Sequence, residues 1–198
     1  MPPIRSLADL DLTRTYTYAD YLTWQLGEWV ELLRGRIRRM SPAPTRLHQQ
    51  LSGKFYRPIA NHLWRRPCEI YHAPFDVRLT TRGANAADDA ITTVVQPDLC
   101  VICDPAQLDD RGCVGAPDWI IEILSPGTAG RDINEKFTLY EENGVTEYWI
   151  VAPGEKNISV FVLENDRYKL IGDYWQPGPV LVHTLPDLVV EWSEVFEG

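Results

Sequence analysis

The chain has 198 residues, of which 44% are hydrophobic, 24% charged and 11% aromatic. This composition is typical of one folded domain and excludes wholesale disorder, collagen and low-complexity sequence. The formal net charge of -9, from 19 Lys plus Arg against 28 Asp plus Glu, opposes general attraction to nucleic acid. Any phosphate-binding face must therefore be local.

The sequence has no stretch near the ~18 uninterrupted apolar residues that a membrane span needs. The N-terminal residues MPPIRSLADLDL lack the apolar segment of a secretory signal. We therefore expect no membrane association and a cytoplasmic location, where the four cysteines stay reduced. Cys100 and Cys103 are three apart on an expected strand and so point to opposite faces, and no second such pair exists. Buried thiols are thus a better account of these cysteines than zinc ligands.

Residues 1–15 are expected to form a polar N-terminal arm. Thr17 and Asp20 are spaced as in a capping box, which predicts a short helix that ends near Gly27. The runs WVELL and RIRRM then flank Arg34-Gly35, and this two-residue break predicts a tight hairpin with Glu31 on its first strand.

A long helix is predicted next, because apolar residues recur every fourth position from Leu47 to Leu63. It is expected to end before Pro67 and to cover a sheet. Two strand-like runs follow, EIYHA and FDVRL, and then a polar loop over residues 80–90.

The second half of the chain predicts strands in VVQPDLCVIC, DWIIEIL and TEYWIVA, and a helix over residues 131–143 that Gly144 ends. A hairpin turning at residues 164–166 comes next. Because helices interrupt the strands in β-α-β order, the expected fold class is α/β. One domain over residues 1–198 should hold a central mixed β-sheet flanked by helices, with additional hairpins.

Glu122 is the most informative position, because WIIEIL is apolar on both alternating faces, as in an interior strand. A buried, unpaired carboxylate costs several kcal/mol, so this side chain requires a cation, a hydrogen-bond donor or a proton. Asp98 stands at the edge of another apolar strand. Two converging carboxylates repel one another unless a cation lies between them, so a metal site is one reading. A structural salt bridge for Glu122 and an ordinary turn residue for Asp98 are the alternatives.

Asp132, Lys136 and Tyr140 are spaced i, i+4, i+8 and so lie along one stripe of the following helix. This stripe either faces the two carboxylates or carries an exposed Asp–Lys pair. Arg36 and Arg38 fall on one face of the first hairpin and could contact phosphates, although solvated surface arginines would look the same.

Longer segments carry a family resemblance: VELLRGRIRRMSPAPTRLHQQ, APFDVRL, VVQPDLCVICDP, IIEILSPGTAGRDINEKFTLYEENGVTEYWIV and a late LPDL. Together they resemble the Uma-two family of restriction endonucleases, within the PD-(D/E)XK nuclease superfamily, over nearly the whole chain. The resemblance implies a restriction-endonuclease-like core and a metal site formed by Glu31, Asp98 and Glu122. The wider superfamily has a Lys two residues after that Glu, whereas this chain has Leu124. Lys136 from the next helix is the natural substitute.

Carboxylate oxygens suit Mg²⁺ or Mn²⁺, which would activate a water for attack on a phosphodiester. Lys136 would orient or help deprotonate that water and stabilise the transition state. Tyr140 and Asp132 would support the site, and His48 would orient a ligand or contact substrate unless it faces solvent.

The resulting hypothesis is a metal-dependent endonuclease acting on DNA. The alternative is an inactive member of the fold that binds nucleic acid or a protein, and an acid-base hydrolase with another substrate is a distant third. Nucleases of this architecture often pair, so we expect a homodimer. Late aromatics would line its interface or pack in the core: Tyr174, Trp175, Trp192 and Phe196.

Overall fold

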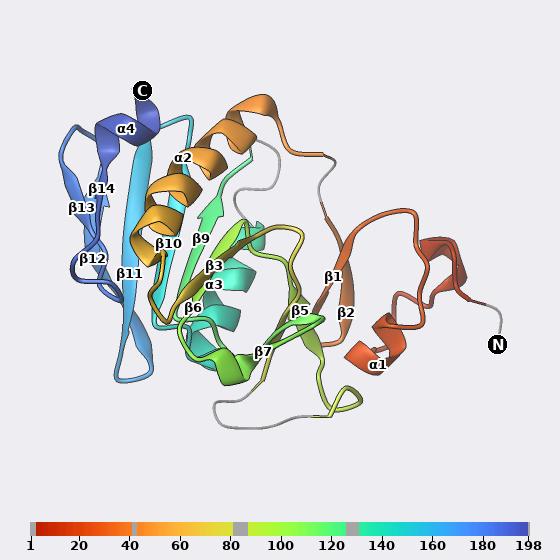
Figure 1. The fold of residues 1–198 in the computed structure, drawn as a ribbon. Helices are drawn as coiled ribbons and strands as arrows, with labels where there is room; N and C mark the ends of the chain where they lie inside the picture. Colours follow the sequence, from red (N-terminus) through yellow and green to blue (C-terminus); the bar gives the residue numbers. More distant parts are fainter. Residues whose placement is uncertain (1–2, 41–42, 81–86, 126–130, 198) are drawn as a thin grey trace.

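The computed structural model describes residues 3–40, 43–80, 87–125 and 131–197, without the side chains of residues 131 and 132. The described strands form two six-stranded sheets and one two-stranded sheet, and helices pack against them (Figure 1). The predicted α/β class is confirmed. The separate six-stranded sheet that contains β4, β5, β7 and β8 was not expected, because these strands have only two or three residues and show no alternation.

The first sheet has the order β2-β1-β5-β4-β8-β7. Its strands are β1 (Val30–Leu33), β2 (Arg36–Arg39), β4 (Val77–Leu79), β5 (Thr93–Val95), β7 (Leu108–Asp109) and β8 (Gly112–Val114). The short 3-10 helix η2 (Pro105–Gln107) precedes β7. Strands β1 and β2 form the predicted hairpin, in which Arg34 and Gly35 both have positive φ, as a two-residue turn of primed type requires. Glu31 lies on β1 as predicted.

The N-terminal residues pack onto this sheet. A 3-10 helix η1 (Leu7–Asp9) and helix α1 (Tyr18–Tyr21) contribute buried apolar side chains to a cluster with Val30 and Val94. The Thr17–Asp20 capping box is confirmed, but α1 ends at Tyr21 and not near Gly27. The expected polar arm is anchored, because Leu7 and Leu10 are buried.

The second sheet has the order β12-β11-β10-β9-β6-β3. Its strands are β3 (Glu69–His72), β6 (Leu99–Ile102), β9 (Trp119–Ile123), β10 (Glu147–Ala152), β11 (Asn157–Glu164) and β12 (Arg167–Tyr174). Parallel strands β9 and β10 are joined through helix α3 (Arg131–Asn143), which forms the predicted β-α-β unit. The hairpin of β11 and β12 turns at residues 165–166, close to the predicted position.

Two helices cover the two faces of this sheet (Figure 1). Helix α2 (Arg46–Leu63) packs Phe55 against Trp149 in one core cluster, and α3 packs Tyr140 against Tyr148 in the other. This double cover explains why WIIEIL is apolar on both faces. The buried stripe of α2 begins at His48 and not at Leu47, which is exposed.

The C-terminal segment closes one end of the molecule. Strands β13 (Pro179–Leu181) and β14 (Val189–Glu191) pair, and helix α4 (Trp192–Phe196) follows them. Trp192 is buried in the core cluster that contains Phe55 of α2, and Tyr174 and Phe196 pack against this cluster. Three of the four aromatics considered for a dimer interface therefore belong to the core, whereas Trp175 is exposed.

A disulfide joins Cys68 and Cys103, so the expectation of four reduced thiols is wrong for this pair. The two residues flank antiparallel strands in which Glu69 lies opposite Ile102, and this register places the cysteines directly opposite each other. Cys100 and Cys113 are buried free thiols, as predicted. No helix in the described part of the chain is long and apolar enough to cross a membrane.

Candidate active site

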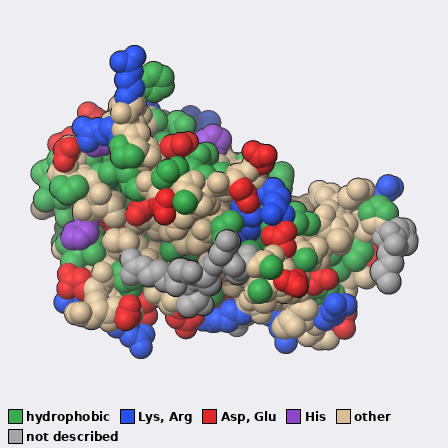
Figure 2. Space-filling model, turned by 60° about the horizontal axis from the view of Figure 1, so that its bottom comes forward, with side chains coloured by type: hydrophobic (Ala, Val, Ile, Leu, Met, Phe, Trp, Pro, Cys, Tyr) green, Lys and Arg blue, Asp and Glu red, His purple; other side chains and the backbone are tan. Residues whose placement is uncertain are grey.

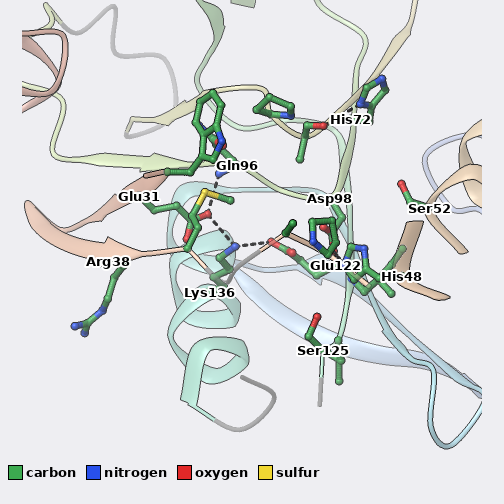
Figure 3. A pocket seen from close by; sticks show the side chains of 18 of the residues that line it. Glu31, Arg38, His48, Ser52, His72, Gln96, Asp98, Glu122, Ser125 and Lys136 are labelled. Carbon is green, nitrogen blue, oxygen red and sulfur yellow. Dashed lines mark hydrogen bonds and ion pairs between the residues drawn. The ribbon is translucent and has the colours of Figure 1, made fainter. Parts of the chain in front are cut away.

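The two large sheets meet where β5 of the first sheet is followed, after only residues 96–98, by β6 of the second. A pocket of about 490 Å³ lies at this junction. Its wall includes Glu31 from β1, Asp98 from the junction, Glu122 from β9 and Lys136 from α3 (Figure 3). The fold thus brings together the four residues to which the sequence analysis gave catalytic roles.

Glu31 is held in place by the backbone of the junction. Its Oε1 accepts a hydrogen bond from the backbone N–H of Gln96 at 2.9 Å and lies 3.0 Å from Nζ of Lys136. All four residues of β1 are buried, since the strand lies between β2 and β5. The carboxylate is therefore fixed at the pocket wall by a charged and a neutral donor.

Glu122 Oε1 accepts hydrogen bonds from Lys136 Nζ at 3.0 Å and from the Tyr140 hydroxyl at 2.7 Å. Burial raises the pKa of Glu122 to about 7, and the charges of Asp98 and Glu31 add to this effect. Lys136 and Tyr140 oppose the rise by stabilising the ionised form. At neutral pH this carboxyl is consequently poised between its two protonation states.

Lys136 lies between Glu31 and Glu122, with Nζ 3.0 Å from an oxygen of each (Figure 3). Burial disfavours its charge, but the two carboxylates outweigh burial and raise the pKa of Lys136 well above its ordinary value. The ammonium is therefore charged at neutral pH. Leu124, two residues after Glu122, contributes an apolar side chain to the pocket wall.

Asp98 is positioned from two sides. Its Oδ2 accepts a hydrogen bond from the backbone N–H of Ile123 at 2.7 Å and lies 3.1 Å from Nε2 of His48. The hydrogen bond to Asp98 raises the pKa of His48, against the effect of burial. His48 is buried, so the solvent-facing alternative is wrong. Its Nδ1 has no hydrogen-bond partner in the described part of the chain.

The carboxylates of Asp98 and Glu122 are the groups in the pocket wall that could hold a divalent cation. Within the described residues their hydrogen bonds use only Oδ2 and Oε1, which leaves the second oxygen of each for a ligand. No group of three or more His, Cys, Asp or Glu among those residues is placed to hold a metal ion. Mg²⁺ does not require such a group, because it is commonly held by one or two carboxylates together with substrate phosphate.

The other residues predicted for the site differ in whether they reach the pocket. Tyr140 contacts Glu122 as the helical stripe suggested, and Arg38 lines the pocket while pairing with Glu135 at 3.2 Å. Arg36 lies away from the pocket wall and donates to the backbone oxygen of Thr13. Asp132 lies outside the residues whose side chains are described.

The sequence analysis missed Gln96, a buried residue that binds Glu31 through its N–H and Asp76 through Nε2 at 2.8 Å. A polar residue inside the apolar run VVQPDLCVI was the available signal. It also missed Trp29, whose exposed side chain lines the pocket.

Comparisons with known proteins place these observations in a wider context. The model of the Uma2 family, described as "Putative restriction endonuclease", matches residues 18–193. An uncharacterized protein from Synechocystis, slr1290, is 26% identical over 158 residues, which cover 78% of each chain. A crystal structure from Anabaena variabilis, described as a "putative nuclease belonging to DUF820", aligns with a TM-score of 0.70. It is 19% identical, and the alignment covers 92% of this chain and 98% of that one.

Proposed function

The chain belongs to the Uma2 family, and from this premise we propose that it is a divalent-metal-dependent endonuclease that hydrolyses DNA phosphodiester bonds. The observation that carries the proposal is the position of Lys136 Nζ, 3.0 Å from both Glu31 and Glu122, in a pocket that Asp98 also lines. Carboxylates beside a fixed ammonium are the groups that phosphoryl chemistry requires.

Asp98 and Glu122 would hold Mg²⁺ or Mn²⁺ through their second oxygens, with Glu31 completing the acidic wall. When bound there, the cation supplies an activated water and neutralises charge on the scissile phosphate. His48 and the Ile123 N–H fix the Asp98 carboxylate, and Tyr140 fixes that of Glu122. The two ligands are therefore preorganised by their neighbours.

Lys136 acts in this proposal as a permanent positive charge and not as a general base. Its raised pKa keeps the ammonium protonated at neutral pH. A protonated amine cannot accept the proton of the attacking water, but it stabilises negative charge that develops on the phosphate. This narrows the role expected from the sequence, where the lysine was also considered as a group that deprotonates the water.

The alternative is a catalytically inactive protein of the same fold that binds nucleic acid or a protein. It is favoured by one observation: Lys136 already pairs with both Glu31 and Glu122, as a purely structural ion-pair network would do. The two functions differ in metal binding and in cleavage.

Cleavage of supercoiled plasmid in Mg²⁺ or Mn²⁺ tests the proposal. We expect nicking by the wild type and a loss of at least about 100-fold in Asp98→Asn and Lys136→Met, since one electrostatic stabiliser contributes roughly that factor. The matched control is Lys169→Met, which removes an exposed lysine paired with Glu164 on the distant β11–β12 hairpin. Wild-type protein that neither nicks DNA nor binds Mn²⁺ in calorimetry would favour the inactive module.

A further inference from the structure

We propose that the pocket takes an unpaired strand of DNA, with one base stacked on the indole of Trp29. This inference rests on the proposed function, because it concerns the substrate of the same site. Three observations carry it: the recessed position of the charged groups, the exposure of Trp29 beside them, and the pairing of the neighbouring arginines with acids.

The charged groups of the site are recessed. The side chains of Glu31, Glu122 and Lys136 are only 8%, 13% and 15% exposed. The pocket above them, about 490 Å³, has a volume typical of small-ligand sites, roughly 300–1,000 Å³. A segment of nucleotide size can enter such a space, whereas a strand held in a duplex must first leave the helix at a cost of a few kcal/mol. An unpaired strand avoids that cost.

Trp29 stands at this pocket with 63% of its surface exposed. It lies two residues before Glu31, and alternation along an extended strand places both side chains on the same face of the hairpin. The backbone oxygen of Trp29 accepts a hydrogen bond from Met40 N–H at 3.1 Å, which extends the pairing of β1 and β2 to this residue. An exposed indole at the pocket provides a flat surface on which a nucleobase can stack.

The two arginines that line the pocket are both paired with acids. Arg38 pairs with Glu135 and Arg39 with Glu28. On the face drawn in Figure 2, Lys and Arg side chains are interspersed with Asp and Glu. Duplex binding depends mainly on neutralised phosphates, so a chain with a net charge of -9 and paired arginines is poorly suited to it. Stacking is less dependent on net charge.

Apolar side chains complete the pocket wall. Leu33, Leu124 and Ile133 line it together with the charged groups. They supply contact surface for a sugar and a base without selecting a sequence, which agrees with stacking as the source of affinity.

Binding in EDTA separates this inference from the proposed function, because cleavage cannot occur there. Fluorescence anisotropy would compare a labelled twelve-nucleotide strand with the blunt duplex of the same sequence, for wild type, Trp29→Phe, Trp29→Ala and Trp64→Ala. Trp64 is the matched control: it is 76% exposed and does not line the pocket. Circular dichroism melting verifies that each variant is folded.

We expect the single strand to bind at least 10-fold more tightly than the duplex. Trp29→Ala should weaken that binding about 10-fold, within the range of one lost base stack. Trp29→Phe should lose less, and Trp64→Ala should match the wild type. Equal or tighter duplex binding, no binding of either DNA, or equal effects of Trp29→Ala and Trp64→Ala would overturn the inference. Metal-dependent duplex cleavage that survives Trp29→Ala would reject it while leaving the nuclease proposal standing.

Discussion

The Lys136 ammonium lies 3.0 Å from Oε1 of Glu122, although the two residues belong to different elements, α3 and β9. The i, i+4 spacing that places Tyr140 above Lys136 brings the tyrosine hydroxyl to the same oxygen at 2.7 Å. One carboxylate oxygen is thus shared by a charged and a neutral donor. The consequences of this arrangement for stability, pH dependence and metal binding can be measured.

Removing the ammonium should destabilise the protein. Lys136→Met leaves the buried carboxylates of Glu31 and Glu122 without their shared cation. The expected loss is about 3–5 kcal/mol in the free energy of unfolding at pH 8, as for other broken buried ion pairs. Urea denaturation at pH 8 and at pH 5.5 measures it. The loss should be smaller at pH 5.5, where Glu122 takes up a proton; an equal loss at both pH values would contradict the pairing.

The raised pKa of Glu122 predicts how stability depends on pH in the metal-free protein. The folded-state pKa of about 7 exceeds the ordinary value of 4.5. The stabilising contribution of the protonated form is complete below the lower value and is lost as pH rises through the higher one. Glu122→Gln cannot ionise, so its stability relative to wild type should increase from pH 5 to pH 8. A difference that stays constant in urea titrations across this range would refute the raised pKa.

Binding of a divalent metal ion should compete with protonation of the Glu122 carboxyl. Divalent ions need the ionised carboxylate, so Mn²⁺ binding to a site containing Glu122 must release a proton when the pH is below about 7. Calorimetry at pH 6.5 in two buffers of different ionisation enthalpy would count the protons. We expect net release at pH 6.5, close to none at pH 8.5, and weaker Mn²⁺ affinity at the lower pH. Binding without any proton release would place the ion elsewhere.

His48 should act on the metal through Asp98. Its Nε2 lies 3.1 Å from the aspartate oxygen that also accepts the Ile123 N–H. The loss of a residue that orients a metal ligand typically weakens metal binding by about 10- to 100-fold. We expect His48→Ala to weaken Mn²⁺ binding by this factor while the protein stays folded. His183→Ala, at an exposed position, is the control and should bind like the wild type.

Much of the fold follows from local patterns in the sequence. The hairpin at Arg34-Gly35, helix α2 and the β-α-β unit around α3 each have a strong periodicity or turn signal, and all are present. The first sheet has no such signal beyond its β1–β2 hairpin, because its other strands are short and pair across distant parts of the chain. The Cys68–Cys103 disulfide depends on the same kind of long-range register.

The candidate site was predictable in its acids but not in its supporting contacts. Glu122 was conspicuous as a charge in an apolar strand, and Lys136 follows it by 14 residues on the next predicted helix. The links from Gln96 to Glu31 and from His48 to Asp98 join residues 65 and 50 positions apart. No periodicity reports such pairs, since they exist only after the two sheets have met.

Glu147 shows why a buried carboxylate is not sufficient to identify a site, and it provides the last test. It is fully buried at the start of β10 yet does not line the pocket. Its oxygens accept hydrogen bonds from the Trp149 indole N–H, from the backbone N–H groups of His183 and Thr184, and from the Thr184 hydroxyl. These contacts anchor the segment between β13 and β14 to the sheet.

Glu147→Ala should therefore lower the free energy of unfolding by about 3 kcal/mol or more, because several donors lose their acceptor. Mn²⁺ affinity and DNA cleavage, measured below the melting temperature of the variant, should equal those of the wild type. Glu122→Gln should behave in the opposite way, with a folded protein that has lost cleavage. If Glu147→Ala abolished cleavage in the folded state, the separation between a structural and a functional buried glutamate would be wrong.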